Sequence, residues 1–358
     1  MLSRMRIIIT VFTLSTFVAL CSGCGQSGET PYPDQREKST AKIKIGFSMS
    51  TLREERWQRD RDIFVARAKE LGADVIVQNA NNDSDEQQRQ VKYLLDQGID
   101  ILVIVPQDAS KATAEVQQAK KQGIKVISYD RLVLNADADL YISFDNVRVG
   151  ELMAESLTQQ VPKGNYVIIN GANTDNNCFM FNKGYMNVLK SYVDRGDIKI
   201  ISEVWAKDWM HEDAFNCIET TLQTGQTIDA VIAANDSLAA AAIEALSEKR
   251  LAGKVPVVGH DADLSGCQRV AEGTQLMTVY KPIHQIAKRA AEIAIEMAMG
   301  EKVEVNRTLN DGKYNVPYYM IQPIAVTRDN LKDTVIKDSF HRLEDIYMNV
   351  PKSQWPSE

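Results

Sequence analysis

One form recurs three times in the sequence: "LGADVIVQNA" (71–80), "QGIDILVIVP" (97–106) and "QGIKVISYDR" (122–131). In each copy a glycine precedes a β-branched apolar run, and the three glycines are 26 and 25 residues apart. That spacing accommodates one helix and one strand. A glycine just past a helix end supplies a left-handed cap, and a continuous apolar strand suits a parallel sheet covered on both faces. The pattern therefore predicts a doubly wound α/β fold with parallel strands.

The second half of the chain repeats this alternation of strands and helices. At 358 residues the chain is longer than one hydrophobic core usually supports, so we expect two similar α/β lobes. Expected strands in this half are "NYVIIN" (165–170), "IDAVIAAN" (228–235), "KVPVVG" (254–259) and "LMTVY" (276–280), and expected helices are 237–248 and 283–299.

We expect the chain to cross between the two lobes three times, near Asn146, Lys281 and Pro323. The expected N-terminal lobe is 43–145 plus 282–322, and the expected C-terminal lobe is 146–281 plus 323–345, followed by a tail, 346–358.

The first residues, "MLSRMRIIITVFTLSTFVALCSGC", are typical of an export signal. Arg4 and Arg6 precede an apolar run, 7–20, whose length suits a signal peptide better than a membrane span. The run ends in a sequence that resembles a bacterial lipobox, with Cys24 as the lipidated residue after removal of 1–23. An uncleaved membrane anchor is the alternative, and either way the protein is tethered to the cell envelope, in the periplasm or on the outer face of the cytoplasmic membrane. The polar segment 24–42 is expected to be a flexible linker.

Composition argues against two classes of site. The formal net charge is −7 and basic runs are missing from the sequence, whereas a nucleic-acid footprint requires a basic face. The four histidines lie far apart, so no metal site or other cofactor is expected. Beyond the N-terminal segment there are three cysteines, Cys178, Cys217 and Cys267; an odd number leaves at least one free thiol, and their pairing stays open.

Polar side chains follow almost every expected strand. Ligands of open parallel sheets bind beyond the carboxyl ends of the strands. Each Asp or Asn taken alone is more often a helix cap or a turn residue, but seven such groups suggest a site. Their acids, amides and cations suit hydroxyl groups, and indoles cover the apolar face of a sugar ring, so a neutral polyhydroxylated ligand is indicated. The groups are "YDR" (129–131), "SFDN" (143–146), "TDNN" (174–177), "KDW" (207–209), "AND" (234–236), "GHDAD" (259–263) and "YK" (280–281).

Enzymatic interpretations have less support. The sequence contains no G-x-G-x-x-G after the first strand, no P-loop and no G-x-S-x-G elbow. Asp130 and Asp261 can be imagined as a glycosidase pair, but the sequence does not fix their separation. We therefore expect a binding protein and no catalysis.

Seven stretches in order give the chain a resemblance to the periplasmic sugar-binding proteins of ABC transporters, in particular their D-xylose-binding members. The likeness runs from about residue 42 to 340. The stretches are "LREERWQRDRDIFV" (52–65), "YDR" (129–131), "YISFDN" (141–146), "DNN" (175–177), "DADL" (261–264), "GTQLMTVYKPI" (273–283) and "DTVIKDSFH" (333–341).

The resemblance implies a two-lobed, hinged receptor that closes over one pyranose. It implies that Trp57 and Trp209 sandwich the sugar ring and that Lys281 lies at a hinge crossing. From the residues alone, Trp57 could equally open the buried stripe of a helix; the resemblance implies that it faces sugar rather than core. The remaining implied ligands are Arg56, Asp130 and Arg131 from the first lobe and Asp175, Asn177, Asn235 and Asp261 from the second.

The implied function is delivery of a monosaccharide, with D-xylose the expected ligand, to an ABC permease. Bulky Trp and Arg side chains in a small site are expected to exclude glucose, whose exocyclic CH2OH a pentose lacks. The alternative is a sensor with the same fold and ligand, which signals to a membrane histidine kinase or chemoreceptor. A sugar-responsive repressor would need a DNA-binding headpiece ahead of the first strand, where this chain has an export signal and a polar segment.

Overall fold

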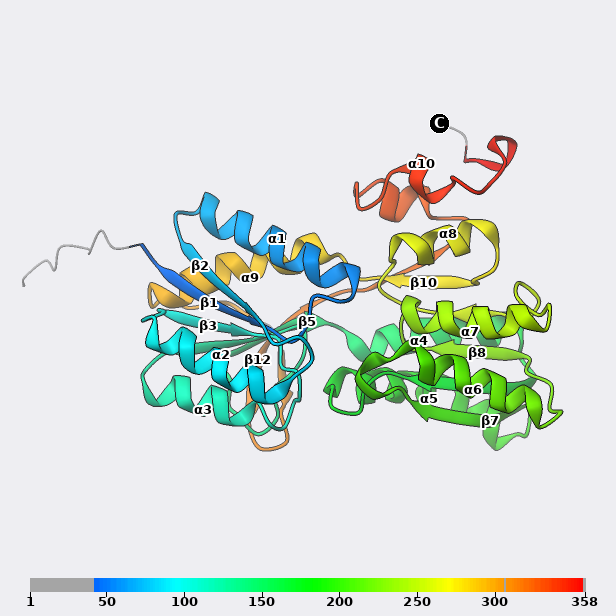
Figure 1. Cartoon of the computed structure of the whole chain (residues 1–358), viewed down its shortest axis with the longest axis horizontal. Helices are drawn as coiled ribbons and strands as arrows, with labels where there is room; N and C mark the ends of the chain where they lie inside the picture. The colour runs from blue at the N-terminus through cyan, green and yellow to red at the C-terminus, as the bar shows by residue number, and fades with distance from the viewer. Residues whose placement is uncertain (1–41, 306, 357–358) are drawn as a thin grey trace, which may run out of the picture. The chain divides into compact units, whose positions relative to one another are not determined.

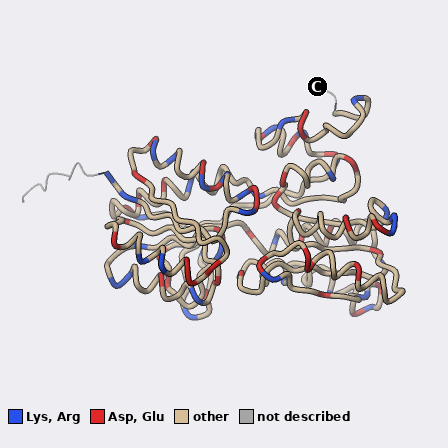
Figure 2. Tube along the Cα trace, in the orientation of Figure 1, with Lys and Arg blue, Asp and Glu red and all other residues tan. Residues whose placement is uncertain are grey.

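The computed structural model describes residues 42–305 and 307–356. The predicted signal peptide and the lipidated Cys24 lie outside the described residues, as does the predicted linker apart from Lys42. Among the described residues, no helix combines the length and the apolar character needed to span a bilayer. Figure 2 shows acidic and basic residues interspersed along the helices.

The strands of the described residues form two sheets, of which the first has seven strands in the order β11-β12-β5-β4-β3-β1-β2. Neighbouring strands are parallel except for β11, which pairs antiparallel with β12. The strands are β1 (Lys44–Met49), β2 (Asp74–Asn79), β3 (Ile101–Ile104), β4 (Lys125–Tyr129), β5 (Leu140–Phe144), β11 (Arg307–Asn310) and β12 (Asn315–Ile321).

Helices cover both faces of this sheet, α1 and α9 on one side and α2 and α3 on the other (Figure 1). Strand β3 is apolar throughout because helices cover it on both faces. Ile101 and Val103 belong to the cluster under α1 and α9, while Leu102 and Ile104 belong to the cluster under α2 and α3. Successive side chains of a strand alternate between faces, so a doubly covered strand needs an unbroken apolar run. The helices are α1 (Glu55–Glu70), α2 (Ser84–Asp96), α3 (Thr113–Lys121) and α9 (Ile283–Ala298).

The second sheet has six strands in the order β13-β10-β9-β8-β6-β7 and is also covered on both faces. Its strands are parallel except for β13, which runs antiparallel to β10. The strands are β6 (Gly164–Asn170), β7 (Ile198–Trp205), β8 (Ala230–Ala233), β9 (Val257–Val258), β10 (Met277–Tyr280) and β13 (Ile324–Thr327); the helices are α4 (Asn146–Gln160), α5 (Asn176–Asp194), α6 (His211–Gln223), α7 (Asp236–Glu248) and α8 (Leu264–Glu272).

The predicted fold class, two doubly wound sheets, is therefore confirmed. The expected strand 254–259 is shorter than predicted, because only Val257–Val258 pairs as β9. Pro256, immediately before it, has no N–H to donate to a strand ladder.

The chain passes between the sheets after β5, after β10 and again between β12 and β13, which only Gln322 and Pro323 separate. We accordingly propose a lobe of 43–145 plus 282–322 and a second of 146–281 plus 323–345. The last described residues lie against α8. Trp355 donates its indole N–H to the carbonyl of Val350 at 2.9 Å and packs beside Tyr347, in a cluster that contains Val270 of α8.

Helices α4 and α5 approach closely enough that only glycine fits at their contact. A Cβ added to Gly150 would lie 2.1 Å from the carbonyl oxygen of Phe181, and one added to Gly184 would lie 2.1 Å from the carbonyl oxygen of Val147. Both obstacles are backbone atoms, which cannot rotate away. This contact holds α5, whose N-terminal end carries site residues, against α4.

We expect Gly184→Ala to lower the free energy of unfolding by about 1–3 kcal/mol, because the two helices must separate to admit the methyl group. Urea denaturation would measure the change. Lys183→Ala, at an exposed position on the same helix, is the control and should stay within about 0.5 kcal/mol of the unmodified protein. Equal stability of the two variants would show that the helix contact is not tight.

Candidate ligand-binding site

One cavity lies where the carboxyl ends of strands from both sheets meet. It encloses about 330 Å³ of space between its lining side chains, part of which is open to solvent. All ten predicted ligand residues line it, together with three residues that the sequence analysis did not select. The ten are Arg56, Trp57, Asp130, Arg131, Asp175, Asn177, Trp209, Asn235, Asp261 and Lys281; the three are Glu54, Phe181 and His260.

Arg56 links carboxylates that come from the two sheets. Its guanidinium lies 2.8 Å from Asp130, which follows β4, and 3.4 Å from Asp261, which follows β9. A third carboxylate, Asp60, lies one helical turn further along α1 at 3.2 Å. All four side chains are at least nine-tenths buried, so the charges are paired with one another and not with bulk solvent.

Asp60 is a functional neighbour that the sequence analysis missed. Burial raises its pKa to about 6, although the nearby Arg56 guanidinium lowers it, and the Tyr129 hydroxyl donates a hydrogen bond to its carboxylate. The signal was present in the i, i+4 spacing of Arg56 and Asp60, which places oppositely charged side chains on one face of a helix. Asp60 does not line the cavity, so its role is to orient Arg56.

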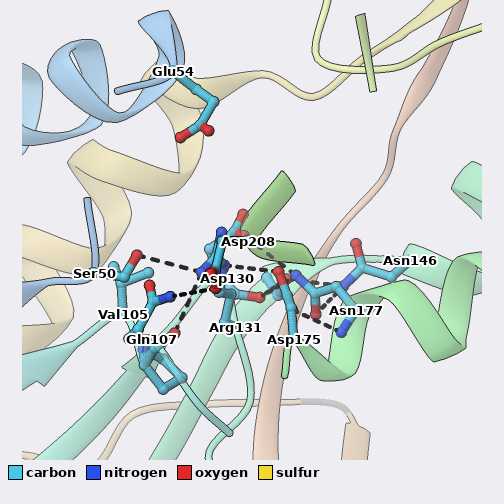
Figure 3. Close-up of polar contacts among 12 residues, drawn as sticks. Ser50, Glu54, Val105, Gln107, Asp130, Arg131, Asn146, Asp175, Asn177 and Asp208 are labelled. Atoms are coloured by element: carbon cyan, nitrogen blue, oxygen red, sulfur yellow. Dashed lines mark hydrogen bonds and ion pairs between the residues drawn. The ribbon is translucent and has the colours of Figure 1, made fainter. Parts of the chain in front are cut away.

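A second network joins the first sheet to the start of α5 (Figure 3). The Arg131 guanidinium lies 2.8 Å from the Asp175 carboxylate. Asn177 donates to the carbonyl and the carboxylate of Asp130 at 3.1 and 3.3 Å, and its own side-chain oxygen accepts from Asn146 at 3.0 Å. Burial raises the pKa of Asp175, although Arg131 lowers it. The network crosses between the sheets, so it depends on their approach.

Two of the predicted ligands are also helix caps. Asp175 accepts a hydrogen bond from the amide of Asn177 at the start of α5, and Asn235 accepts one from the amide of Leu238 at the start of α7. A residue of this kind can therefore cap a helix and line the cavity at the same time, as Asp175 of "DNN" and Asn235 of "AND" do. A capping side chain is held rigidly by its helix, which places it reproducibly at the cavity wall.

Lys281, directly after β10, forms the closest ion pair with Asp261, at 2.8 Å. Burial alone would raise the pKa of Asp261, but Lys281, His260 and Arg56 together hold it well below its usual range. Asp261 is therefore ionised and accepts hydrogen bonds at all physiological pH values.

The two indoles form different parts of the wall. Trp57 is 3% exposed and packs in the hydrophobic cluster beneath α1, so it contributes to the core and also lines the cavity. That it faces sugar stays a prediction. The guanidinium carbons of Arg56 and Arg131 lie 4.3 and 5.2 Å from its ring centroid. These cation–π contacts explain how a tryptophan remains buried among so many charges.

Trp209 lies over Gly171, at the end of β6. A Cβ added to Gly171 would lie 2.4 Å from the indole ring, so only glycine leaves room for Trp209 there. Asp208 and Trp209 both have positive φ, 48° and 59°, in the short 3-10 turn Lys207–Trp209. Backbone strain of this kind is maintained by surrounding contacts and is commonly found at functional sites.

His260 is the clearest omission from the predicted set, since "GHDAD" was recognised but only its Asp261 was selected. Its ring is 2% exposed, 4.6 Å from the Phe181 ring and edge-on to Trp209. Burial lowers its pKa to about 3, and Lys281 lowers it further against the opposing effect of Asp261. The imidazole is therefore neutral, and its role is to support the indole and not to add charge.

Contacts at the rim show that the lobes are closed over the cavity. Arg53, just before α1, donates to the carbonyl of Asp208 at 2.6 Å, and the amide of Ala109 donates to the carbonyl of Thr174 at 2.9 Å. Each bond joins a segment of the first sheet's lobe to one of the second.

In the part of the chain that the structure describes, no feature supports a metal site or a nucleophilic cysteine. These residues contain no group of three or more His, Cys, Asp or Glu side chains placed to hold a metal ion. Cys178, Cys217 and Cys267 are unpaired, which resolves the pairing that the sequence left open. Burial raises the pKa of all three thiols, so none is activated as a nucleophile.

The fold and the cavity agree with the comparison to known proteins. Residues 45–302 match the model of the periplasmic binding protein domain, and the chain belongs to the periplasmic binding protein family. Two similar proteins are the D-xylose-binding periplasmic proteins of Escherichia coli (strain K12) and Haemophilus influenzae. They are 48% identical to this chain over 305 and 306 residues, which in each case is 85% of this chain and 92% of the relative.

Solved structures give the same family. An ABC transporter solute binding protein from Clostridium phytofermentans with bound β-D-glucose has a TM-score of 0.79 at 29% identity, covering 85% of this chain and 99% of its own. A carbohydrate transporter solute binding protein from Chloroflexus aurantiacus in complex with D-glucose also has a TM-score of 0.79, at 27% identity, covering 86% and 98%. The family is one of solute-binding proteins.

We expect the ring resonances of His260 not to titrate between about pH 5 and pH 8, because burial and the neighbouring cations hold its pKa near 3. NMR of the imidazole protons against pH would measure this. A midpoint for His260 above pH 5 would mean that the ring is solvated or faces an acid more directly than the structure indicates.

Proposed function

We propose that the protein is an extracytoplasmic receptor that binds one monosaccharide, D-xylose, and delivers it to an ABC importer. The observation that carries the proposal is the convergence of ten specific side chains, from seven separate segments, on one cavity between the lobes. The 48% identity to two D-xylose-binding periplasmic proteins supports the choice of sugar. No reaction is needed: the site binds and releases its ligand unchanged.

The hydrogen-bonding groups of the cavity suit a polyol. Three acids that line the cavity accept hydrogen bonds: Asp130, Asp175 and Asp261. Three cations that line it donate hydrogen bonds: Arg56, Arg131 and Lys281. Asn177 and Asn235 can do both. A sugar hydroxyl donates and accepts at once, so it can bridge an acid and a cation without disturbing the balance of charge. Bonds to charged partners are the stronger ones, which suits capture of a heavily hydrated ligand.

The indoles supply the apolar part of recognition. We propose that Trp57 and Trp209 lie on opposite faces of the pyranose, where its C–H groups gather. Close contacts restrict the movement of both indoles. Trp209 packs against Gly171, and the guanidinium groups of Arg56 and Arg131 lie over the ring of Trp57. A hexose must place an additional CH2OH in the space between the indoles, so we propose that the site excludes glucose, in contrast to the two glucose-bound relatives at 27–29% identity.

Transport requires that the bound state be recognised. We propose that sugar stabilises the closed arrangement, in which rim bonds such as Arg53 to Asp208 form, and that the permease reads this closed surface. We further propose that Cys24 carries the lipid that holds the receptor at the envelope. The alternative role as a sensor subunit is not favoured by any feature of residues 42–305 and 307–356.

Isothermal titration of residues 43–358 with D-xylose, glucose, arabinose and ribose tests the ligand. We expect a micromolar dissociation constant for xylose, about −8 kcal/mol, and much weaker binding of glucose. Trp209→Ala should abolish most binding by removing one face of the sandwich. Trp205→Ala is the matched control, since Trp205 packs on Phe179 and does not line the cavity. Equal affinity for glucose and xylose would refute the exclusion, and no heat with any pentose would refute the choice of sugar.

Asp261→Ala tests the charge network. We expect a loss of about 2–4 kcal/mol in binding free energy, because the change removes an acceptor and leaves Arg56 and Lys281 uncompensated. The same titration measures it. Asp194→Ala, at an exposed carboxylate on α5, is the control and should bind as the unmodified protein does. An affinity for Asp261→Ala close to that of the control would mean that Asp261 takes no part in binding.

A further inference from the structure

Asp236 is a fully buried carboxylate that neither the sequence analysis nor the cavity accounts for. It is the first residue of α7, directly after Asn235, and it does not line the cavity. Its carboxylate accepts three hydrogen bonds, from the Gln275 side-chain amide at 2.7 Å, the Thr278 hydroxyl at 2.9 Å and the Asp263 backbone amide at 3.0 Å. Asp263 belongs to the loop after β9, which also contains Asp261, while Gln275 precedes strand β10 and Thr278 lies within it.

The backbone around Asp236 extends the same connections. The Asp236 amide donates to the carbonyl of His260 at 2.9 Å, and the Thr278 hydroxyl accepts from the amide of Ala262 at 3.1 Å. The loop 260–263 is thus held at His260, Ala262 and Asp263, on both sides of Asp261. Each of these contacts leads to Asp236 directly or through Thr278.

The loop needs such restraint because its conformation is unfavourable in isolation. Asp261 has φ of 96° and Ala262 has φ of 53°, in the left-handed region that residues other than glycine rarely adopt. Strain of this kind persists only where surrounding contacts enforce it. Without them, Asp261 would relax away from Arg56 and Lys281.

Two glycines pack so closely against the Asp236 carboxylate that neither position has room for a Cβ atom. A Cβ on Gly259 would lie 2.4 Å from one carboxylate oxygen of Asp236, and a Cβ on Gly266 would lie 2.2 Å from the other. The loop after β9 and the start of α8 therefore both pack directly on this group. Burial raises the pKa of Asp236 to about 7, although Arg269, Gln275 and Thr278 lower it. A carboxylate this costly to bury is a poor choice for packing alone.

We propose that Asp236 is a positioning residue for ligand binding: acting through Thr278 and the backbone of 260–263, it fixes Asp261 and His260 at the cavity wall. The proposal rests on the sugar-binding function proposed above for the cavity. It also explains the dipeptide Asn235-Asp236, in which the first residue lines the cavity and the second holds the opposite loop.

Asp236→Asn is the direct test, because an amide keeps the shape but cannot accept from all three donors. We expect xylose affinity to fall by about tenfold or more, the loss associated with leaving buried donors unpaired. Since this variant could also fold poorly, a second pair of variants separates position from stability. Thr278→Val removes the bond on the loop side of the carboxylate, and Gln275→Met removes one on the side away from the loop.

We expect Thr278→Val to weaken xylose binding by about tenfold and Gln275→Met by about threefold or less, even where their melting temperatures fall equally. Thr278→Ser keeps the hydroxyl and should recover most of the affinity. Hydrogen exchange at the amides of Ala262 and Asp263 provides a readout that does not depend on the sugar. It should accelerate in Thr278→Val and not in Gln275→Met.

Equal affinity losses in Thr278→Val and Gln275→Met, in proportion to their melting temperatures, would overturn the proposal and reduce Asp236 to a stabilising residue. Unchanged exchange of the loop in Thr278→Val would overturn it as well. If the unmodified protein binds no pentose, the proposed function fails, while the exchange experiment still decides whether Asp236 holds the loop.

Discussion

A guanidinium shared between two sheets is the interaction on which the rest of the site depends. Arg56 is buried, and its charge is balanced by Asp130 from one sheet and Asp261 from the other. A buried ion that loses a partner is strongly destabilising. The first lobe supplies Asp60 and Asp130, and the approach of the second lobe adds Asp261, so closure of the lobes completes the neutralisation of the cavity. The strained loop at Asp261 and the cap at the start of α5 serve that event.

Charge counting explains the kind of ligand that fits. Three cations line the cavity with four acids, of which Glu54 is paired with Arg53, and Asp60 adds a further buried carboxylate behind Arg56. Asp60 does not line the cavity, so its charge lies away from the cavity wall. Its pKa is raised, and the Tyr129 hydroxyl donates a hydrogen bond to its carboxylate. The wall itself therefore stays balanced, and an ionic ligand would upset it. Groups already fixed in position by mutual pairing also lose little freedom when a sugar arrives.

The sequence predicted what depends on local pattern and missed what depends on orientation. Strand runs, glycine caps and the polar residues after strands follow from periodicity, and together with the family resemblance they led to ten of the thirteen residues that line the cavity. Glu54 and Phe181 line the cavity without a pattern that marks them, since nothing local shows which side chain of a helix faces a cleft. Asp60 could have been found from its spacing to Arg56. Asp236 could not, because "AND" gives no indication that its third residue contacts Asp263, 27 residues later.

The order of strands in the first sheet reverses the usual order of assembly. Strand β12 lies between β5 and β11, and α9 packs on α1, so the N-terminal sheet is incomplete until almost the entire chain has been made. The second sheet, in contrast, lacks only its edge strand β13 once β10 is present. Domains of a growing chain usually fold from the N-terminus onward. Here the face of the first sheet that α9 covers stays exposed until α9 has been made.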